Sequence, residues 1–280
     1  MKPTVAVIAA GAMGSGVGKR LTENGVTVLT SLEGRSAASA KRASDAGMKA
    51  ATESEIAAAD FILSIVPPGD AQALAERLAP ALRASNRKPI YVDCNAVGPD
   101  TAKKVAAAVI ATGAPFVDGG IIGGPPRAGY TPTLYVSGPD AAKVAVLNDC
   151  GLKIKVMPGP VGDASALKMA YAGLNKGLVA LGSAMVLAAE RAGVGEALRE
   201  ELKLSQVPML AQLSRGVPDM FPKAYRWVAE LEEIARFAGP GAESEIFQGI
   251  ADLYARIAKD FEGPKAETGT LASFYAAAKK

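Results

Sequence analysis

Short apolar runs alternate with amphipathic stretches along residues 4 to 157. The intervening stretches, such as Asp70–Ala84 and Pro99–Thr112, carry apolar residues at helical spacing, whereas the runs have the length of buried strands. This alternation predicts an α/β domain with a doubly wound parallel sheet covered by helices. The expected strands are Val5–Ala9, Val26–Thr30, Phe61–Val66, Ile90–Asp93, Pro115–Val117, Leu134–Ser137 and Lys153–Met157.

The strand pattern stops after Gly159 and Pro160, and the remainder of the chain is helical in pattern. A long apolar helix is expected over Ser165–Arg191, ended by Gly193-Val194-Gly195. We therefore expect two domains, an α/β domain at residues 1–160 and an all-α domain at residues 161–280. Further helices are expected over Glu196–Gln212, Pro222–Phe237, Glu243–Phe261 and Thr268–Lys280.

The segment Leu174–Ala189 is so apolar that it needs burial on nearly every face. A bundle of about 120 residues does not supply that cover, so we expect a homodimer formed through the helical domain. The longest apolar run, Leu178–Ala189, is shorter than the roughly 20 residues that a transmembrane helix needs, and no membrane partner is expected.

Composition removes several classes of protein. The net charge is only +3 and the 31 basic residues are scattered, so no nucleic-acid partner is expected. Cys94 and Cys150 are the only cysteines, which excludes a disulfide framework and favours a reducing, cytoplasmic location. The chain has no histidine, which excludes a histidine-based catalytic triad and most zinc sites, so no metal is expected.

A dinucleotide-type turn follows the first expected strand. Gly11-Ala12-Met13-Gly14 lies between that strand and a helix, so Gly11, Ala12, Met13 and Gly14 are expected to place their backbone amides against a pyrophosphate. The first glycine of the usual G-x-G-x-x-G pattern is replaced by Ala9. The alternative is a plain tight turn between strand and helix.

The second expected strand ends without the acidic residue that usually binds the ribose of NAD. Ser31, Arg35 and Ser36 follow instead, and two hydroxyls with a guanidinium suit a 2′-phosphate. We therefore expect NADP(H) to be preferred, with NAD(H) possible. Glu33 favours the opposite choice, and the alternative for Arg35 is a solvated loop position.

Several motifs follow one another in order along the chain: the glycine turn, Val66-Pro67-Pro68, Asp93-Cys94-Asn95-Ala96-Val97-Gly98-Pro99, Asp118-Gly119-Gly120-Ile121-Ile122-Gly123-Gly124, and Gly162 followed by Lys168. This series resembles the β-hydroxyacid dehydrogenase family, which includes 3-hydroxyisobutyrate and 6-phosphogluconate dehydrogenases and shares its fold with imine reductases. Residues 224–231 resemble a poorly characterised subgroup with its own C-terminal helical domain.

The resemblance implies roles for individual positions. It places Val66, Pro67 and Pro68 beside the cofactor ribose, Asn95 and Ala96 near the nicotinamide, and Ile122, Gly123 and Gly124 against the substrate carboxylate. It also makes Lys168 the family's lysine. The chain departs from the pattern where Ile122 replaces a serine, Gly120 a proline and Ala172 an asparagine.

Lys168 is the candidate general acid–base in a chain without histidine. On a helix, Tyr171 and Asn175 lie on the same face as Lys168. Tyr171 is a candidate to orient the lysine or to act as the acid itself, and Asn175 is a candidate to bind a substrate carboxylate. Arg226 and Trp227 are candidates for closing the substrate pocket. The alternatives are a salt-bridged or snorkelling lysine and a core tryptophan.

These observations predict an NADPH-preferring oxidoreductase acting on a small oxo or hydroxy compound, with a small-molecule substrate that the sequence does not name. Two alternatives remain: an imine reductase, and a non-catalytic sensor that binds NADP(H).

Overall fold

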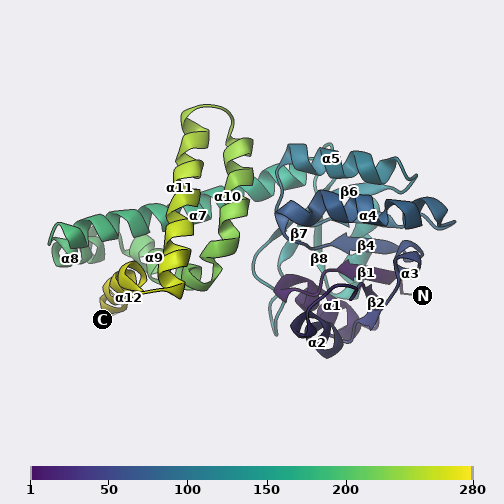
Figure 1. The fold of residues 1–280 in the computed structure, drawn as a ribbon, viewed down its shortest axis with the longest axis horizontal. Helices are drawn as coiled ribbons and strands as arrows, with labels where there is room; N and C mark the ends of the chain where they lie inside the picture. The colour runs from purple at the N-terminus through teal and green to yellow at the C-terminus, as the bar shows by residue number, and fades with distance from the viewer. Residues whose placement is uncertain (1, 279–280) are drawn as a thin grey trace. The chain divides into compact units, whose positions relative to one another are not determined.

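The computed structural model describes residues 2–278. The chain divides into two compact units, Met1–Met169 and Ala170–Lys280, and the division falls inside the long helix α7 (Asp163–Arg191) (Figure 1). Within residues 2–278, the first unit is α/β and the second contains helices without strands, as the sequence pattern predicts.

One eight-stranded sheet forms the centre of the first unit, with the strand order β3-β2-β1-β4-β5-β6-β7-β8. All neighbouring strands are parallel except β6 and β7, which are antiparallel. The seven expected strands are present, but the sequence pattern misses β3, because it has only two residues and both are exposed. The strands are β1 (Thr4–Ile8), β2 (Thr27–Thr30), β3 (Lys49–Ala50), β4 (Phe61–Ser64), β5 (Ile90–Asp93), β6 (Phe116–Ile122), β7 (Thr133–Ser137) and β8 (Lys153–Val156).

Helices cover both faces of this sheet (Figure 1). Alternate residues of β1 point to opposite faces, so Val5 and Val7 belong to one apolar cluster and Ala6 and Ile8 to the other. Helices α1, α2 and α6 pack on the first cluster, and α3, α4 and α5 pack on the second. These helices are α1 (Ala12–Glu23), α2 (Ala37–Asp45), α3 (Glu53–Ala57), α4 (Ala71–Ala84), α5 (Pro99–Ile110) and α6 (Ala141–Val144), with 3-10 turns η1 (Pro68–Asp70) and η2 (Ala145–Cys150).

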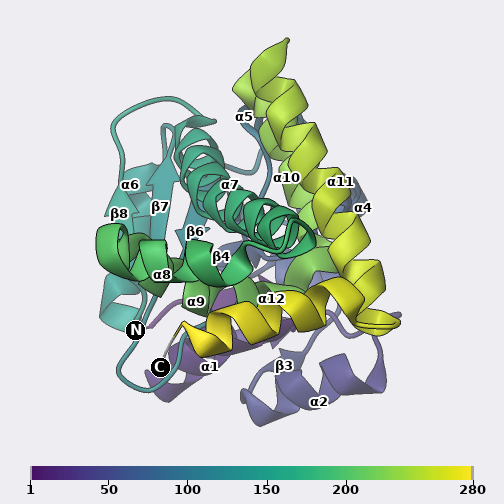
Figure 2. The same cartoon turned by 90° about the vertical axis from the view of Figure 1, so that its left-hand side faces the viewer.

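In the second unit, α10 and α11 form an antiparallel pair beside α7, and α12 packs on α9 (Figures 1 and 2). The prediction of a single helix over Glu196–Gln212 is wrong, because the helix is interrupted at Gln206. Pro208 lies in the first turn of the next helix, where its missing N–H is tolerated, and it is incompatible with a continuous helix through that point. The elements are α8 (Gly195–Ser205), α9 (Val207–Met220), η3 (Phe221–Lys223), α10 (Ala224–Ala238), α11 (Ala242–Glu262) and α12 (Ala266–Ala277).

Within residues 2–278, α7 alone has the length and apolar composition of a membrane-crossing helix. Half of its most apolar window is buried inside the protein, and a core helix satisfies the same two criteria.

Candidate functional site

The turn from β1 into α1 is shaped by a close approach that only glycine permits. A Cβ on Gly14 would lie 1.8 Å from the carbonyl oxygen of Ala9, and next to Gly11 there is open space. The amides of Ala12, Met13 and Gly14 make no hydrogen bond within the described part of the chain, and no acidic residue occupies the first turn of α1. Free amides at a helix N-terminus are suited to bind a pyrophosphate.

The end of β2 carries the residues expected at a 2′-phosphate. Ser31 is buried, and the Ser36 hydroxyl caps α2 by accepting a hydrogen bond from the Ser39 amide at 3.3 Å. The Arg35 side chain is exposed. Of the three predicted residues, Arg35 therefore presents a charged side chain at the surface of this loop, whereas Ser31 is buried and the Ser36 hydroxyl caps a helix.

Arg42 is a neighbour of this loop that the sequence analysis missed. Its Nε donates to the carbonyl oxygen of Ala10 at 2.9 Å, and its Nη2 donates to the Ser39 hydroxyl at 2.8 Å. The guanidinium thus lies against the β1–α1 turn. The signal in the sequence is weak, because a basic residue on an exposed helix face is common and Ala10 is 32 positions away.

Asn95 fixes the loop after β4. Its Oδ1 accepts a hydrogen bond from the Val66 amide at 2.6 Å, its Nδ2 donates to the Ser64 hydroxyl at 2.8 Å, and the residue is 2% exposed. The side chain is therefore occupied within the protein, and it shapes the Val66-Pro67-Pro68 loop from behind. Pro67 is exposed, and Pro68 and Ala96 are partly exposed, so their surfaces remain accessible.

Asp118 in β6 is a fully buried carboxylate that accepts four hydrogen bonds. Its Oδ2 accepts from the Ser137 hydroxyl at 3.1 Å and from the amides of Gly162 and Ser165 at 3.0 Å each. Its Oδ1 accepts from the Ser165 hydroxyl at 2.6 Å. Because Gly162 and Ser165 belong to the start of α7, this carboxylate joins β6 to that helix.

Asp93 lies opposite Asp118 in the β5–β6 register. Its Oδ1 accepts from the Asn95 amide at 3.0 Å, but its Oδ2 is buried without a partner in the described chain. The pKa of Asp93 is raised to about 7, chiefly by burial and also by the charge of Asp118, whereas the hydrogen bonds from Asn95 oppose the shift. Asp93 is therefore mostly protonated below about pH 7 and mostly ionised above it.

Lys168 reaches the carboxyl end of the sheet. Its Nζ donates to the carbonyl oxygen of Ile121 at 2.8 Å, and the side chain is partly buried. The helix lies close to the strand at Gly120, where a Cβ would approach the Ala164 oxygen to 2.7 Å and the Lys168 Cβ to 3.0 Å. This contact explains why glycine replaces the proline expected at position 120.

The backbone beyond β6 turns sharply at Gly123, whose φ is +125°. A Cβ there would lie 2.1 Å from the Tyr130 hydroxyl, so this position requires glycine. Gly124 has open space beside it, which leaves its backbone accessible to a ligand. Ile122 is partly exposed.

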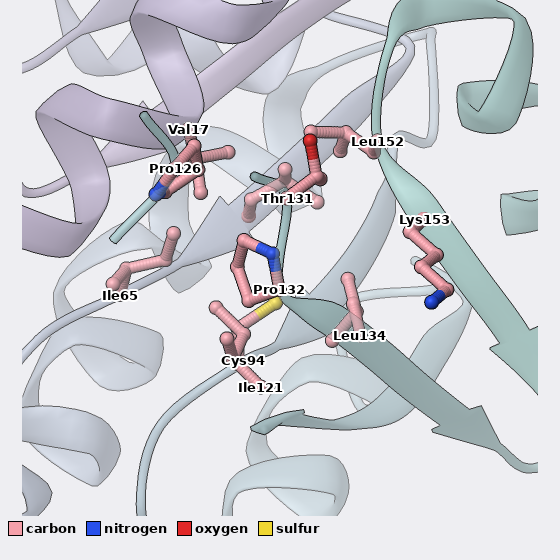
Figure 3. A pocket seen from close by; sticks show the side chains of 11 residues that line it. Val17, Ile65, Cys94, Ile121, Pro126, Thr131, Pro132, Leu134, Leu152 and Lys153 are labelled. Carbon is pink, nitrogen blue, oxygen red and sulfur yellow. The ribbon is translucent and has the colours of Figure 1, made fainter. Parts of the chain in front are cut away.

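The loop at residues 123–132 is tied to α1. The backbones of Arg127 and Tyr130 bond to each other at 3.0 and 2.9 Å, and Arg20 donates to both of their carbonyl oxygens. Beneath the loop lies an apolar cavity of about 20 Å³ that Cys94 and Pro132 help to line (Figure 3). That volume holds about one water molecule, so the cavity is too small for a nicotinamide ring.

The remaining predicted residues lie in the helical unit. Tyr171 is about half exposed, and Asn175 donates to the Tyr171 carbonyl oxygen at 2.8 Å along α7. The Trp227 ring packs edge-on against Tyr254, with centroids 5.5 Å apart, and the Lys176 Nζ lies 5.2 Å from its centre.

Trp227 is therefore partly buried and packed against this unit, whereas the neighbouring Arg226 is exposed. Lys176 also forms a largely buried ion pair with Glu230, which the sequence analysis did not anticipate.

Comparisons with known proteins agree with this fold. Residues 4–152 match the family model of the NAD binding domain of 6-phosphogluconate dehydrogenase, and residues 189–257 match a domain of unknown function, DUF1932. An uncharacterized 28.5 kDa protein from Methanothermus fervidus is 30% identical over 215 residues, which cover 76% of this chain and 82% of that protein.

Three solved structures illustrate the relationship. Conserved protein MTH1747, of unknown function and described as similar to 3-hydroxyacid dehydrogenases, has a TM-score of 0.72 at 29% identity and covers 92% of this chain and 98% of its own. The 3-hydroxyisobutyrate dehydrogenase of Mycobacterium tuberculosis, solved with L-serine, has a TM-score of 0.71 at 19% identity and covers 93% and 95%. An imine reductase of Myxococcus stipitatus in complex with NADP+ has a TM-score of 0.57 at 22% identity and covers 97% and 99%.

The last two similarities show the fold alone. The match over residues 4–152 spans more than half of the chain and includes the glycine turn, the Val66 loop and Asp118. The protein therefore belongs to the family that carries the NAD-binding domain of 6-phosphogluconate dehydrogenase, with a 3-hydroxyacid dehydrogenase-like fold and a C-terminal DUF1932 domain.

Proposed function

We propose that the protein is an NADPH-preferring oxidoreductase that transfers a hydride between nicotinamide and a small oxo or hydroxy compound. The observation that carries the proposal is the position of Lys168, whose Nζ bonds to the Ile121 oxygen near the carboxyl end of β6. The strands β1, β4, β5 and β6 are parallel, so the β1–α1 turn lies along the same edge. Ligands of open α/β sheets bind at that edge.

Lys168 acts in this proposal as general acid–base. A reduced nicotinamide dinucleotide held by the amides of the β1–α1 turn would supply the hydride, and the carbonyl oxygen of the substrate would gain negative charge. The Lys168 ammonium donates a proton from Nζ to that oxygen, and in the reverse direction the neutral amine accepts it. The open backbone at Gly124 supplies amides for a substrate carboxylate. Tyr171, one helical turn beyond Lys168, is a second proton donor in this proposal.

The preference for NADPH rests on charge at the end of β2. Arg35 is exposed in the loop, and Arg42 already contacts the Ala10 carbonyl of the dinucleotide turn. Two guanidinium groups suit a 2′-phosphate, because each forms charge-assisted hydrogen bonds to its oxygens.

The helical unit is proposed to bind a second copy of the chain. Leu174, Leu181 and Met185 of α7 are 77%, 61% and 55% exposed, which is unusual for large apolar side chains on one helix. With α11, α7 also forms an apolar groove of about 560 Å³, which includes the exposed Ile246. A homodimer explains why a helix this apolar is left uncovered in one chain. Sedimentation analysis of the wild type and of Leu181→Glu tests it: a dimer that the variant converts to a monomer is expected, and a monomeric wild type contradicts the proposal.

The enzymatic proposal is tested by NADPH oxidation with a pooled panel of short and aryl-substituted oxo acids and cyclic imines. The wild type is compared with Lys168→Met and with Lys143→Met, a change at an exposed lysine of the same unit. We expect Lys168→Met to lower turnover of an oxo acid by roughly 10²- to 10⁴-fold, with NADPH binding retained. Lys143→Met is expected to behave as wild type.

Normal turnover by Lys168→Met would show that the assigned proton donor is wrong. Turnover of imines alone would make the protein an imine reductase, where the substrate is already cationic. Tight NADPH binding with no turnover on the panel would favour a sensor.

A further inference from the structure

The start of α7 is held on β6 and β7 by buried hydrogen bonds to side chains of these two strands. Asp118 accepts from the amides of Gly162 and Ser165, and the Ser137 hydroxyl accepts from the Ala164 amide at 3.0 Å. Together these groups bond three amide donors at the helix N-terminus, where helix geometry offers no partners. A carboxylate at this position also interacts favourably with the helix dipole.

The same strand and helix meet again one turn later. Ile121 lies three positions after Asp118 on β6, and Lys168 lies three positions after Ser165 on α7. Asp118 is bonded to Ser165 through its carboxylate, and Ile121 is bonded to Lys168 through the hydrogen bond from Nζ to the Ile121 carbonyl oxygen. The close contact between Gly120 and α7 lies between these two sets of hydrogen bonds. The hydrogen bonds at Asp118 therefore determine where Lys168 lies along β6.

We propose that Asp118 is a positioning residue for Lys168: by fixing the first turn of α7 on β6, it places the lysine amine at the carboxyl edge of the sheet. Asp118 is itself fully buried, so it does not touch a ligand. The inference rests on the proposed function only for its catalytic consequence, because the placement of the amine is measurable without turnover.

The perturbation is Asp118→Asn. One oxygen remains to accept from the amides of Gly162 and Ser165, but the negative charge that strengthens these bonds is lost, and an amide NH₂ replaces the oxygen that accepts from the Ser165 hydroxyl. Ser165→Ala is a milder variant in case Asp118→Asn does not fold, since it removes only the hydroxyl bond of 2.6 Å and leaves the amide bonds in place.

The matched control is Asp260→Asn. Asp260 caps α12 in the other unit by accepting from the amides of Ala266 and Thr268 at 2.9 and 2.8 Å. The control therefore makes the same chemical change at a helix N-terminus that has no connection with Lys168, and it reports what the loss of a cap costs by itself.

The first measurement is the rate at which an amine-reactive acylating reagent modifies Lys168, quantified by peptide mass spectrometry on the full-length protein. We expect about a tenfold faster reaction in Asp118→Asn, because loss of the bond to the Ile121 oxygen frees the amine. Ser165→Ala should show a smaller increase, and Asp260→Asn none. Hydrogen exchange at residues 162–166 should accelerate in the same order.

The second measurement is turnover at saturating NADPH. A displaced proton donor should lower kcat by about 10²-fold in Asp118→Asn, with the Kd for NADPH unchanged. An unchanged Lys168 modification rate in folded Asp118→Asn, or an equal change in Asp260→Asn, would overturn the inference. Failure of the proposed function has a different signature, namely normal turnover by Lys168→Met.

Discussion

The buried carboxyl of Asp93 predicts a pH dependence of stability that one substitution removes. Its Oδ2 has no hydrogen-bond partner within residues 2–278, and the Asp118 carboxylate faces it across the β5–β6 register. Asp93→Asn replaces this oxygen with a group that never ionises. The retained Oδ1 still accepts the hydrogen bond from the Asn95 amide.

The magnitude follows from the pKa. Burial raises the pKa of Asp93 from 3.8 to about 7, so the folded protein binds a proton that the unfolded chain releases. The free energy of unfolding is therefore greatest below about pH 4 and falls as pH rises toward 7, where the loss levels off. At about 1.4 kcal/mol for each pKa unit, the whole effect is about 4 kcal/mol, of which about 2.5 kcal/mol falls between pH 5 and pH 8.

The assay is urea unfolding of the wild type and Asp93→Asn at several values between pH 5 and pH 8. The difference in the free energy of unfolding should shift in favour of the variant by about 2 to 3 kcal/mol over this range. The control is Glu55→Gln in the same unit. Backbone and side-chain hydrogen bonds from Thr52 hold the pKa of Glu55 below its ordinary value, so Glu55 stays ionised throughout. Its difference from the wild type should be constant. A constant difference for Asp93→Asn as well would refute the reasoning.

Three further changes test other parts of the molecule. Gly14→Ala should abolish NADPH binding in a fluorescence titration, because its Cβ would lie 1.8 Å from the Ala9 oxygen; wild-type affinity would show that the turn does not hold the pyrophosphate. Arg42→Ala should weaken NADPH binding by about tenfold, through loss of a charge-assisted contact, and leave NADH binding unchanged; an equal effect on both cofactors would separate Arg42 from the 2′-phosphate. Glu230→Gln leaves the buried Lys176 ammonium without its carboxylate and should lower the free energy of unfolding by about 3 kcal/mol in urea, with NADPH affinity preserved; an unchanged unfolding curve would show that the pair contributes nothing.

Some of the candidate site is readable from the sequence because it is local. The strand, the glycines at 11 and 14 and the following helix are contiguous, so their spacing alone predicts the turn and its free amides. Arg42 and Asp118 could not be assigned their contacts in the same way. Arg42 bonds to a carbonyl 32 positions away, and Asp118 bonds to amides 44 and 47 positions away.

The sequence by itself determined the order of the elements, the division into an α/β and a helical half, and the class of cofactor, because periodicity and turn residues act over a few neighbouring positions. The tertiary structure alone decided that Asn95 shapes its loop from within, that Trp227 packs on Tyr254, and that Asp118 holds the start of α7. Each of these outcomes depends on which distant segment covers a side chain, and burial decides whether a polar group bonds to the protein or faces a ligand.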